Sequence, residues 1–356
     1  MIPFSHKLST YCLSRIFDNT AATYKYYWFL CLLDFYVIKG LTRIKLWDIL
    51  VEMVAKAWYP VTYFRLSFGK SESLYEAIWN LQKGNNIPIN INSDELLALL
   101  HEYIQSPSKR KQLDFLKMNV PFRFLRPWID TSDNNLMAKR SELFENGCLY
   151  KLERVGREWW IEFNTEWLPY LKDNYSILCD FTYWNLTQFL QVRNPNVPNI
   201  ASKLIKSNTR SSLAKQHSFW NEVILKGNHI NCPYTGEMLS IGKYELDHFM
   251  PWSFVSHDLL WNLIPCNPSI NSSKSNKLPN LTIYLPKLAQ AHQNALKIYM
   301  GSGKERKILE DYLILGCTPQ ELVEMNQYQL NNCFAQTFTP LYQIAFNMGF
   351  ETWSYD

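Results

Sequence analysis

The sequence from Lys243 to Pro279 reads KYELDHFMPWSFVSHDLLWNLIPCNPSINSSKSNKLP and places polar side chains at short intervals. An acid directly precedes a histidine, two asparagines follow, and an Asn- and Ser-rich stretch ends at a proline. A fold does not need polar groups at this density, because each one costs free energy to bury unless it is paired. The segment is therefore the candidate functional site of the chain.

Local signals predict two strands and then a short helix in this part of the chain. CPYTGEML turns at Thr235-Gly236 and leads into KYELDHF, which we expect to be the second strand, ended by Pro251. Consecutive strand residues face opposite ways, so Asp247 and His248 can serve one site only where the strand ends or bends.

The helix that follows has a clear predicted start. Asn267 is a favourable N-cap and Pro268 a favourable first helical residue. Asn271 and Lys274 are three residues apart and so share a face of that helix. A carboxylate, an imidazole, an amide oxygen and an ammonium group are thus expected near one point.

Composition indicates a folded chain whose basic charge is concentrated around this segment. The 356 residues are 47% hydrophobic and 19% charged, with a net charge of +4. Residues 201–287 hold nine Lys or Arg and five Asp or Glu, and nine minus five accounts for all of that +4. A polyanion partner would favour such a distribution; a solvated surface with a chance excess explains the charge alone equally well.

The eight cysteines include no CxxC pair, so their spacing predicts neither a four-cysteine zinc site nor a disulfide framework. The most apolar stretch, YYWFLCLLDFYVI, is 13 residues long and contains Asp34, which favours a buried helix over a membrane span. We therefore expect a cytoplasmic protein without membrane association.

The fold class expected is α+β: a mainly helical protein that carries a small mixed domain in its C-terminal half. Helical periodicity dominates residues 1–147, and a strand pair joined at Gly156-Arg157 followed by an Asn- and Pro-rich linker occupies 148–199. The candidate site lies in a domain at 200–287, and residues 288–356 again have helical patterns.

The candidate segment resembles the HNH (ββα-metal) endonucleases, most closely the HNH domain of the type II CRISPR RNA-guided nucleases. The matching positions are Asp247, His248, Pro251, Ser253, Phe254, Asn262, Asn271, Lys274, Ser275 and Pro279. Asn271 stands where many HNH proteins have a second metal-binding histidine, and the paired CxxC motifs are missing, so no structural zinc is expected. An arginine-rich bridge and a second nuclease are also missing, so guide dependence is not carried over.

The resemblance implies a role for each of five residues. His248 would be the general base, Asp247 and Asn271 would hold Mg²⁺ or Mn²⁺, and hard oxygen ligands suit either ion. Asn262 would tie down the loop that orients His248, and Lys274 would offset charge at the phosphate, although a solvated lysine is an equally good interpretation. Candidate nucleic-acid contacts are Lys274, Lys277, Lys215 and Arg210.

The resulting prediction is a metal-dependent HNH endonuclease that hydrolyses DNA to 5′-phosphate and 3′-hydroxyl ends, with restriction or phage defence as the associated setting. One ββα site cuts one strand, so double-strand cleavage would need a homodimer or two events. The helical N-terminal region at 1–147 would have a recognition or regulatory role, and its partner could be DNA, a partner protein or a small activator. Two further alternatives are a catalytically silent HNH-type DNA-binding or scaffold protein and an RNase of the same fold.

Overall fold

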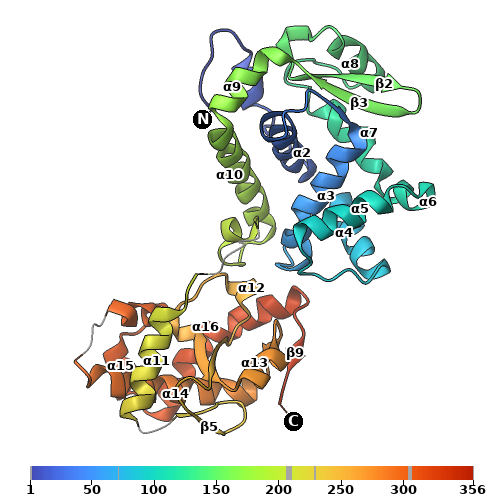
Figure 1. Cartoon of the computed structure of the whole chain (residues 1–356). Coiled ribbons are helices and arrows are strands. Elements are labelled where there is room, and N and C mark those ends of the chain that lie inside the picture. The colour runs from blue at the N-terminus through green and yellow to red at the C-terminus, as the bar shows by residue number, and fades with distance from the viewer. Residues whose placement is uncertain (1, 71, 206–210, 228–229, 304–306, 356) are drawn as a thin grey trace. The chain divides into compact units, whose positions relative to one another are not determined.

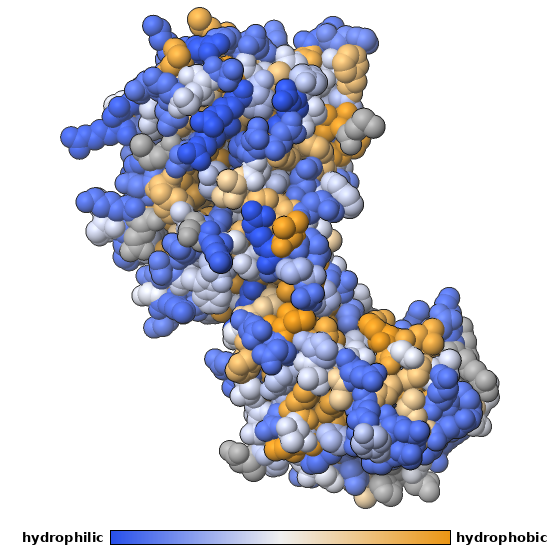
Figure 2. Space-filling model, turned by 180° about the vertical axis from the view of Figure 1, so that it is seen from behind, coloured by the Kyte–Doolittle hydropathy of each residue, from blue (hydrophilic) through white to orange (hydrophobic). Residues whose placement is uncertain are grey.

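The computed structural model describes residues 2–70, 72–205, 211–227, 230–303 and 307–355. The chain divides into two compact units, one formed by residues 1–195 with 200–206 and the other by 196–199 with 207–356 (Figure 1). Among the described residues, no helix combines the length and the apolar composition needed to cross a membrane. On the face shown in Figure 2, hydrophilic residues are interspersed with smaller apolar patches.

The first unit is mainly helical and includes one small sheet. Its helices are α1 (Thr10–Ser14), α2 (Tyr24–Leu33), α3 (Leu46–Thr62), α4 (Ser73–Gly84), α5 (Ser93–Tyr103), α6 (Pro107–Arg110), α7 (Asp114–Arg123), α8 (Asn134–Ser141), α9 (Leu168–Asp173) and α10 (Tyr175–Arg193). Helix α3 buries Trp47, Val51, Val54 and Trp58, spaced three or four residues apart, which is the spacing that puts side chains on one helical face.

The strand pair expected at Gly156-Arg157 is confirmed. Strands β2 (Tyr150–Val155) and β3 (Glu158–Phe163) form an antiparallel hairpin, and Gly156 takes the positive φ (62°) that the turn requires. The short strand β1 (Arg43–Lys45) pairs with the outer edge of β3, giving the order β1-β3-β2. The segment expected to be hairpin and linker also contains α9 and the 19-residue helix α10, which contacts α2 within the same unit.

The second unit consists of helices and of small two-stranded sheets. Its elements are α11 (Ala214–Lys226), β4 (Ile230–Asn231), β5 (Met238–Leu239), β6 (Glu245–His248), α12 (Trp252–Val255), β7 (Leu263–Cys266), α13 (Pro268–Lys274), β8 (Leu278–Pro279), α14 (Leu281–Met300), α15 (Pro319–Glu324), α16 (Gln327–Asn347) and β9 (Thr352–Trp353). Strand β4 pairs with β5, β6 with β7, and β8 with β9. The α+β class with its small domain in the C-terminal half is consistent with this arrangement (Figure 1).

One strand pairing differs from the expectation. Strand β6 does not pair with β5 of the CPYTGEML segment, because β5 pairs with β4, which directly precedes that segment. Its antiparallel partner is β7, with Asp247 opposite Ile264 and His248 opposite Leu263. The reason is burial: all four residues of β7 are buried, so the apolar run LIPC is the strand that completes the core beside β6.

Helices far downstream of the candidate segment complete its core. The ring of Phe338 on α16 packs against Phe249 at a centroid distance of 5.3 Å and against Trp261 at 4.9 Å. The side chain of Asp311 accepts a hydrogen bond from the backbone N–H of Leu260 (2.8 Å). The C-terminal helical region therefore packs against the loop between β6 and β7 and stabilises it.

Candidate active site

Strand β6 carries Asp247 and His248, Asn262 directly precedes strand β7, and helix α13 carries Asn271 and Lys274. Asn267 caps α13 by accepting a hydrogen bond from the N–H of Ser269, and Pro268 is the first helical residue, as expected. The helix lies against β6, so that residues three apart on α13 meet residues two apart on the strand. Lys274 contacts Asp247, and Asn271 contacts Glu245.

Asp247 lies at the centre of a buried polar cluster. Its Oδ2 accepts a hydrogen bond from the hydroxyl of Tyr234 (2.6 Å), and its Oδ1 accepts one from Nζ of Lys274 (2.9 Å). Lys274 Nζ also donates to the backbone carbonyl of His248 (2.7 Å). Burial, followed by the nearby charge of Asp247, raises the pKa of Tyr234 well above its ordinary value, so the phenol stays protonated and remains a donor.

Lys274 occupies a position different from the one expected for a phosphate contact. Its side chain is completely buried, and its ammonium group is bound to Asp247 and to the carbonyl of His248. A charged lysine is buried only when it is paired, and here Asp247 provides the compensating charge. Lys274 therefore ties α13 to the end of β6 and does not present its charge at the surface.

His248 lies at the last position of β6, where the strand ends before Pro251. Its Nε2 is 2.9 Å from Oδ1 of Asp258, and the two side chains retain 11% and 21% of their exposure. Because a carboxylate only accepts hydrogen bonds, this contact places the proton of neutral His248 on Nε2 and leaves Nδ1 as the basic nitrogen. Asp258 was not singled out in the sequence, and a polar residue in a loop ten positions away gives no signal of such a contact.

Asn262 fixes the loop between the two strands. Its Oδ1 accepts from the N–H of Met250 (2.8 Å), its Nδ2 donates to the carbonyl of Met250 (3.0 Å), and its own carbonyl accepts from the N–H of Phe249. The side chain is fully buried, so it acts on the site through the backbone just after His248. The loop-holding role of Asn262 in a catalytic site stays a prediction.

Asn271 and Glu245 form a more accessible pair beside the buried cluster. The amide Nδ2 of Asn271 donates to Oε2 of Glu245 at 2.7 Å, and Glu245 is exposed. In the part of the chain that the structure describes, no three His, Cys, Asp or Glu side chains gather closely enough to hold a metal ion. The neighbouring oxygens come instead from two carboxylates and one amide.

The oxygen donors on β6 and α13 fit a hard divalent cation. A carboxylate offers about four lone-pair positions, and Asp247 uses two of them for Tyr234 and Lys274. The NH₂ group of Asn271 donates to Glu245, so the side-chain carbonyl oxygen of Asn271 is available to a cation. Carboxylate and amide oxygens are the ligands that Mg²⁺ and Mn²⁺ prefer.

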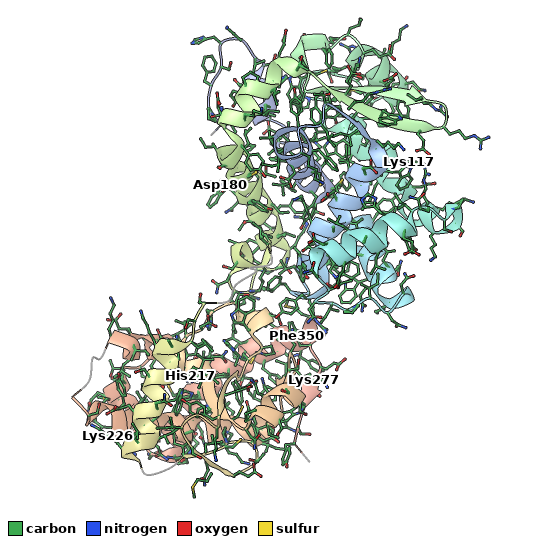
Figure 3. The ribbon with its side chains drawn as sticks, in the orientation of Figure 1. Lys117, Asp180, His217, Lys226, Lys277 and Phe350 are labelled. Carbon is green, nitrogen blue, oxygen red and sulfur yellow. The ribbon has the colours of Figure 1, made fainter. Side chains whose placement is uncertain are left out.

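The expected nucleic-acid contacts are only partly gathered near this site. Lys277 lies three residues after the last residue of α13 (Figure 3). Lys215 is exposed in the first turn of α11, next to Gln216, whose amide donates to the carbonyl of Asp258 (2.9 Å). Arg210 lies outside the described residues.

Comparison with known proteins supports the interpretation of this segment. Residues 232–280 match the family model of the HNH endonucleases. The matched segment starts just before the Tyr234 turn and ends just after β8, so it contains Asp247, His248, Asn262, Asn271 and Lys274. Neither the curated proteins nor the solved structures include a significant match. An HNH endonuclease segment indicates nuclease activity, and HNH nucleases generally use divalent metal ions.

Proposed function

We propose that the chain is a metal-dependent endonuclease that hydrolyses phosphodiester bonds in DNA, with His248 as its general base. The observation that carries this proposal is the contact of His248 with Asp258 at the end of β6, inside the segment that matches the HNH endonucleases. A partly exposed imidazole held by a carboxylate is an arrangement suited to taking a proton from water.

Each protein group would have one task in the reaction. His248 Nδ1 accepts the proton of the attacking water, while Asp258 fixes the ring and stabilises the imidazolium that forms. Asn262 holds the backbone that follows His248. Mg²⁺ or Mn²⁺, held by Asp247 and Asn271, would supply positive charge to the scissile phosphate and the departing 3′ oxygen.

Lys274 has a positioning role in this proposal. Its ammonium group fixes the carboxylate of Asp247 and the carbonyl of His248 relative to α13, which carries Asn271. Lys277 and Lys215, at the end of α13 and the start of α11, are the candidate contacts to the DNA backbone, because phosphate contacts dominate affinity for nucleic acids.

One such site cuts one strand, so we propose nicking by a single chain and double-strand cleavage only with a second copy. Restriction or phage defence is the biological setting that we propose, on the basis of the family resemblance alone.

The test is cleavage of supercoiled plasmid by the purified chain with Mg²⁺, Mn²⁺ or EDTA. We expect metal-dependent conversion to nicked DNA, and His248→Ala should lower the rate by about 10²- to 10⁴-fold, the usual contribution of a general base. His101→Ala is the matched control, since His101 is exposed on α5 in the other unit. Equal cleavage by wild type and His248→Ala would contradict the assignment, and cleavage of matched RNA alone would overturn the DNA substrate.

A further inference from the structure

The first unit contains a cationic cavity that the nuclease proposal does not use. The cavity has a volume of about 670 Å³ and lies between the turn that joins α1 to α2 and the end of α7. Six charged residues line it: Arg15, Asp18, Lys25, Arg123, Arg126 and Asp130. Four cations minus two acids leave a charge of +2 around one small space.

The two acids that line the cavity, Asp18 and Asp130, interact mainly with other arginines. Asp18 is already paired with Arg15, with 3.0 Å between Oδ2 and Nε. Asp130 acts partly on Arg140, which does not line the cavity and whose pKa is raised, mainly by its hydrogen bond to Glu145 and to a lesser degree by Asp130. Among the described residues, neither acid forms an ion pair with Lys25, Arg123 or Arg126, and Asp18 acts on Lys25 only as a nearby charge.

Lys25 lies against the wall of this cavity and is 8% exposed. Its Nζ donates to the backbone carbonyls of Ile16 (3.2 Å) and Asn19 (3.1 Å), two of the three hydrogen bonds that an ammonium group can make. Burial and, to a lesser degree, the positive charges of Arg126 and Arg123 together lower the pKa of Lys25 to about 8, and the charge of Asp18 opposes this shift. The three cations are thus close enough to repel one another.

The two guanidinium groups remain available for a ligand. Arg123 makes one long contact, from Nη1 to the hydroxyl of Tyr24 (3.4 Å), and Arg126 is exposed without a hydrogen bond or ion pair to any other described residue. A guanidinium presents a planar fork of donors that matches the oxygens of a phosphate group. A bound phosphate would also relieve the repulsion among the three cations.

We propose that this cavity binds a small phosphorylated molecule of about nucleotide size, with its phosphate between Arg123 and Arg126 and close to Lys25. The volume falls within the range of small-molecule sites, about 300 to 1,000 Å³. The phenol of Tyr24 and the ring of Pro127 also line the cavity and supply a surface for the non-phosphate part. The exposed carboxylates of Asp18 and Asp130 would repel the continuous charge of a nucleic-acid strand, which favours a single small ligand.

The experiment is isothermal titration calorimetry of the full chain with ATP, AMP and inorganic pyrophosphate at neutral pH, where Lys25 is charged. We expect saturable binding of at least one of these probes to wild type. Arg126→Glu should weaken that binding by about tenfold or more, the size expected for a charge-assisted hydrogen bond. Arg154→Glu is the matched control, because Arg154 is an exposed arginine on β2 and does not line the cavity.

The controls make each outcome decisive. Thermal unfolding of each variant checks that the fold is intact, and Arg123→Gln provides a second, smaller change at the same site.

The proposal is overturned if no probe binds at millimolar concentration, or if Arg126→Glu and Arg154→Glu bind equally well. Binding of a short 5′-phosphorylated oligonucleotide without any binding of the free probes would also overturn it and would assign the cavity to a strand phosphate. Because the readout is binding, failure here leaves the proposed nuclease activity untouched.

Discussion

Two acid–base pairs lie side by side at the end of β6 and differ mainly in their exposure to water. The side chains of Lys274 and Asp247 are 0% and 3% exposed, whereas those of His248 and Asp258 are 11% and 21% exposed. The first pair is locked by additional hydrogen bonds from Tyr234 and to the carbonyl of His248. We therefore expect loss of Lys274 to act mainly on stability and loss of Asp258 to act mainly on rate. Asp247 has both tasks, as the partner of Lys274 and as a proposed metal ligand.

Breaking the buried pair should have the largest effect on stability. Lys274→Met leaves Asp247 charged and uncompensated in the core, and the free energy of unfolding should fall by about 3–5 kcal/mol. Lys277→Met is the control, since Lys277 lies three residues further along and is only half-buried. Urea unfolding measures the free energy of unfolding of both variants. An equal decrease in the two would mean that the buried ion pair does not stabilise the fold more than an ordinary surface lysine does.

Removing the second donor to Asp247 should cost less. Tyr234→Phe deletes the hydroxyl that donates to Oδ2, and a hydrogen bond to a charged group contributes about 1.5–3 kcal/mol. Tyr328→Phe, at an exposed tyrosine on α16, should leave the unfolding midpoint unchanged. A Tyr234→Phe chain as stable as wild type would show that Lys274 alone satisfies Asp247.

The partly exposed pair of His248 and Asp258 should behave in the opposite way, with a loss of rate and little loss of stability. Asp258→Ala should lower kcat on plasmid by about 10- to 100-fold, a part of what a positioned general base contributes, while KM and the unfolding midpoint stay near wild type. Asp258→Asn keeps the size and a hydrogen bond and should recover some of that rate. A change in KM alone would place Asp258 in substrate binding.

Another base in the same unit, His292, is buried and extends the comparison, because it forms no ion pair with an acid among the described residues. Its Nδ1 is 2.7 Å from the hydroxyl of Tyr312, and burial lowers its pKa to about 3. Between pH 6.5 and 3 the unfolded chain binds a proton that the folded chain does not, so stability falls as the pH falls, by about 1.4 kcal/mol per pH unit. His292→Phe should flatten this part of the profile in urea unfolding at several pH values, and an unchanged slope would contradict the assignment.

The sequence was sufficient for features determined by neighbouring residues. Asn267 and Pro268 start α13 as expected, and Gly156 takes the left-handed conformation in the turn of the hairpin. Each of these features depends on one side chain and on the backbone within a few residues of it, so a short stretch of sequence is enough to predict it.

Features that depend on distant partners were not predictable in this way. The pairing of β6 with β7 depends on which apolar strand completes the core, whereas the sequence predicts only that the CPYTGEML segment precedes β6. The burial of Lys274 depends on Asp247 and Tyr234 meeting around it, and the contact of Asp258 with His248 depends on the course of a ten-residue loop. All three features are determined by tertiary packing, which a local sequence pattern does not predict.

The pairing of β8 with β9 has a consequence for when the site can form during synthesis. Strand β9 pairs with the residues that directly follow the HNH motif, and Trp353 Nε1 donates to Ser273 on α13 (3.1 Å). Residues 278 and 352 are far apart in the chain, and a ribosome working at about 5–20 residues per second needs on the order of ten seconds to make the residues between them. A nascent chain therefore carries His248 and Asn271 well before α13 is anchored, and the proposed nuclease activity would begin only after the polypeptide through Trp353 has emerged.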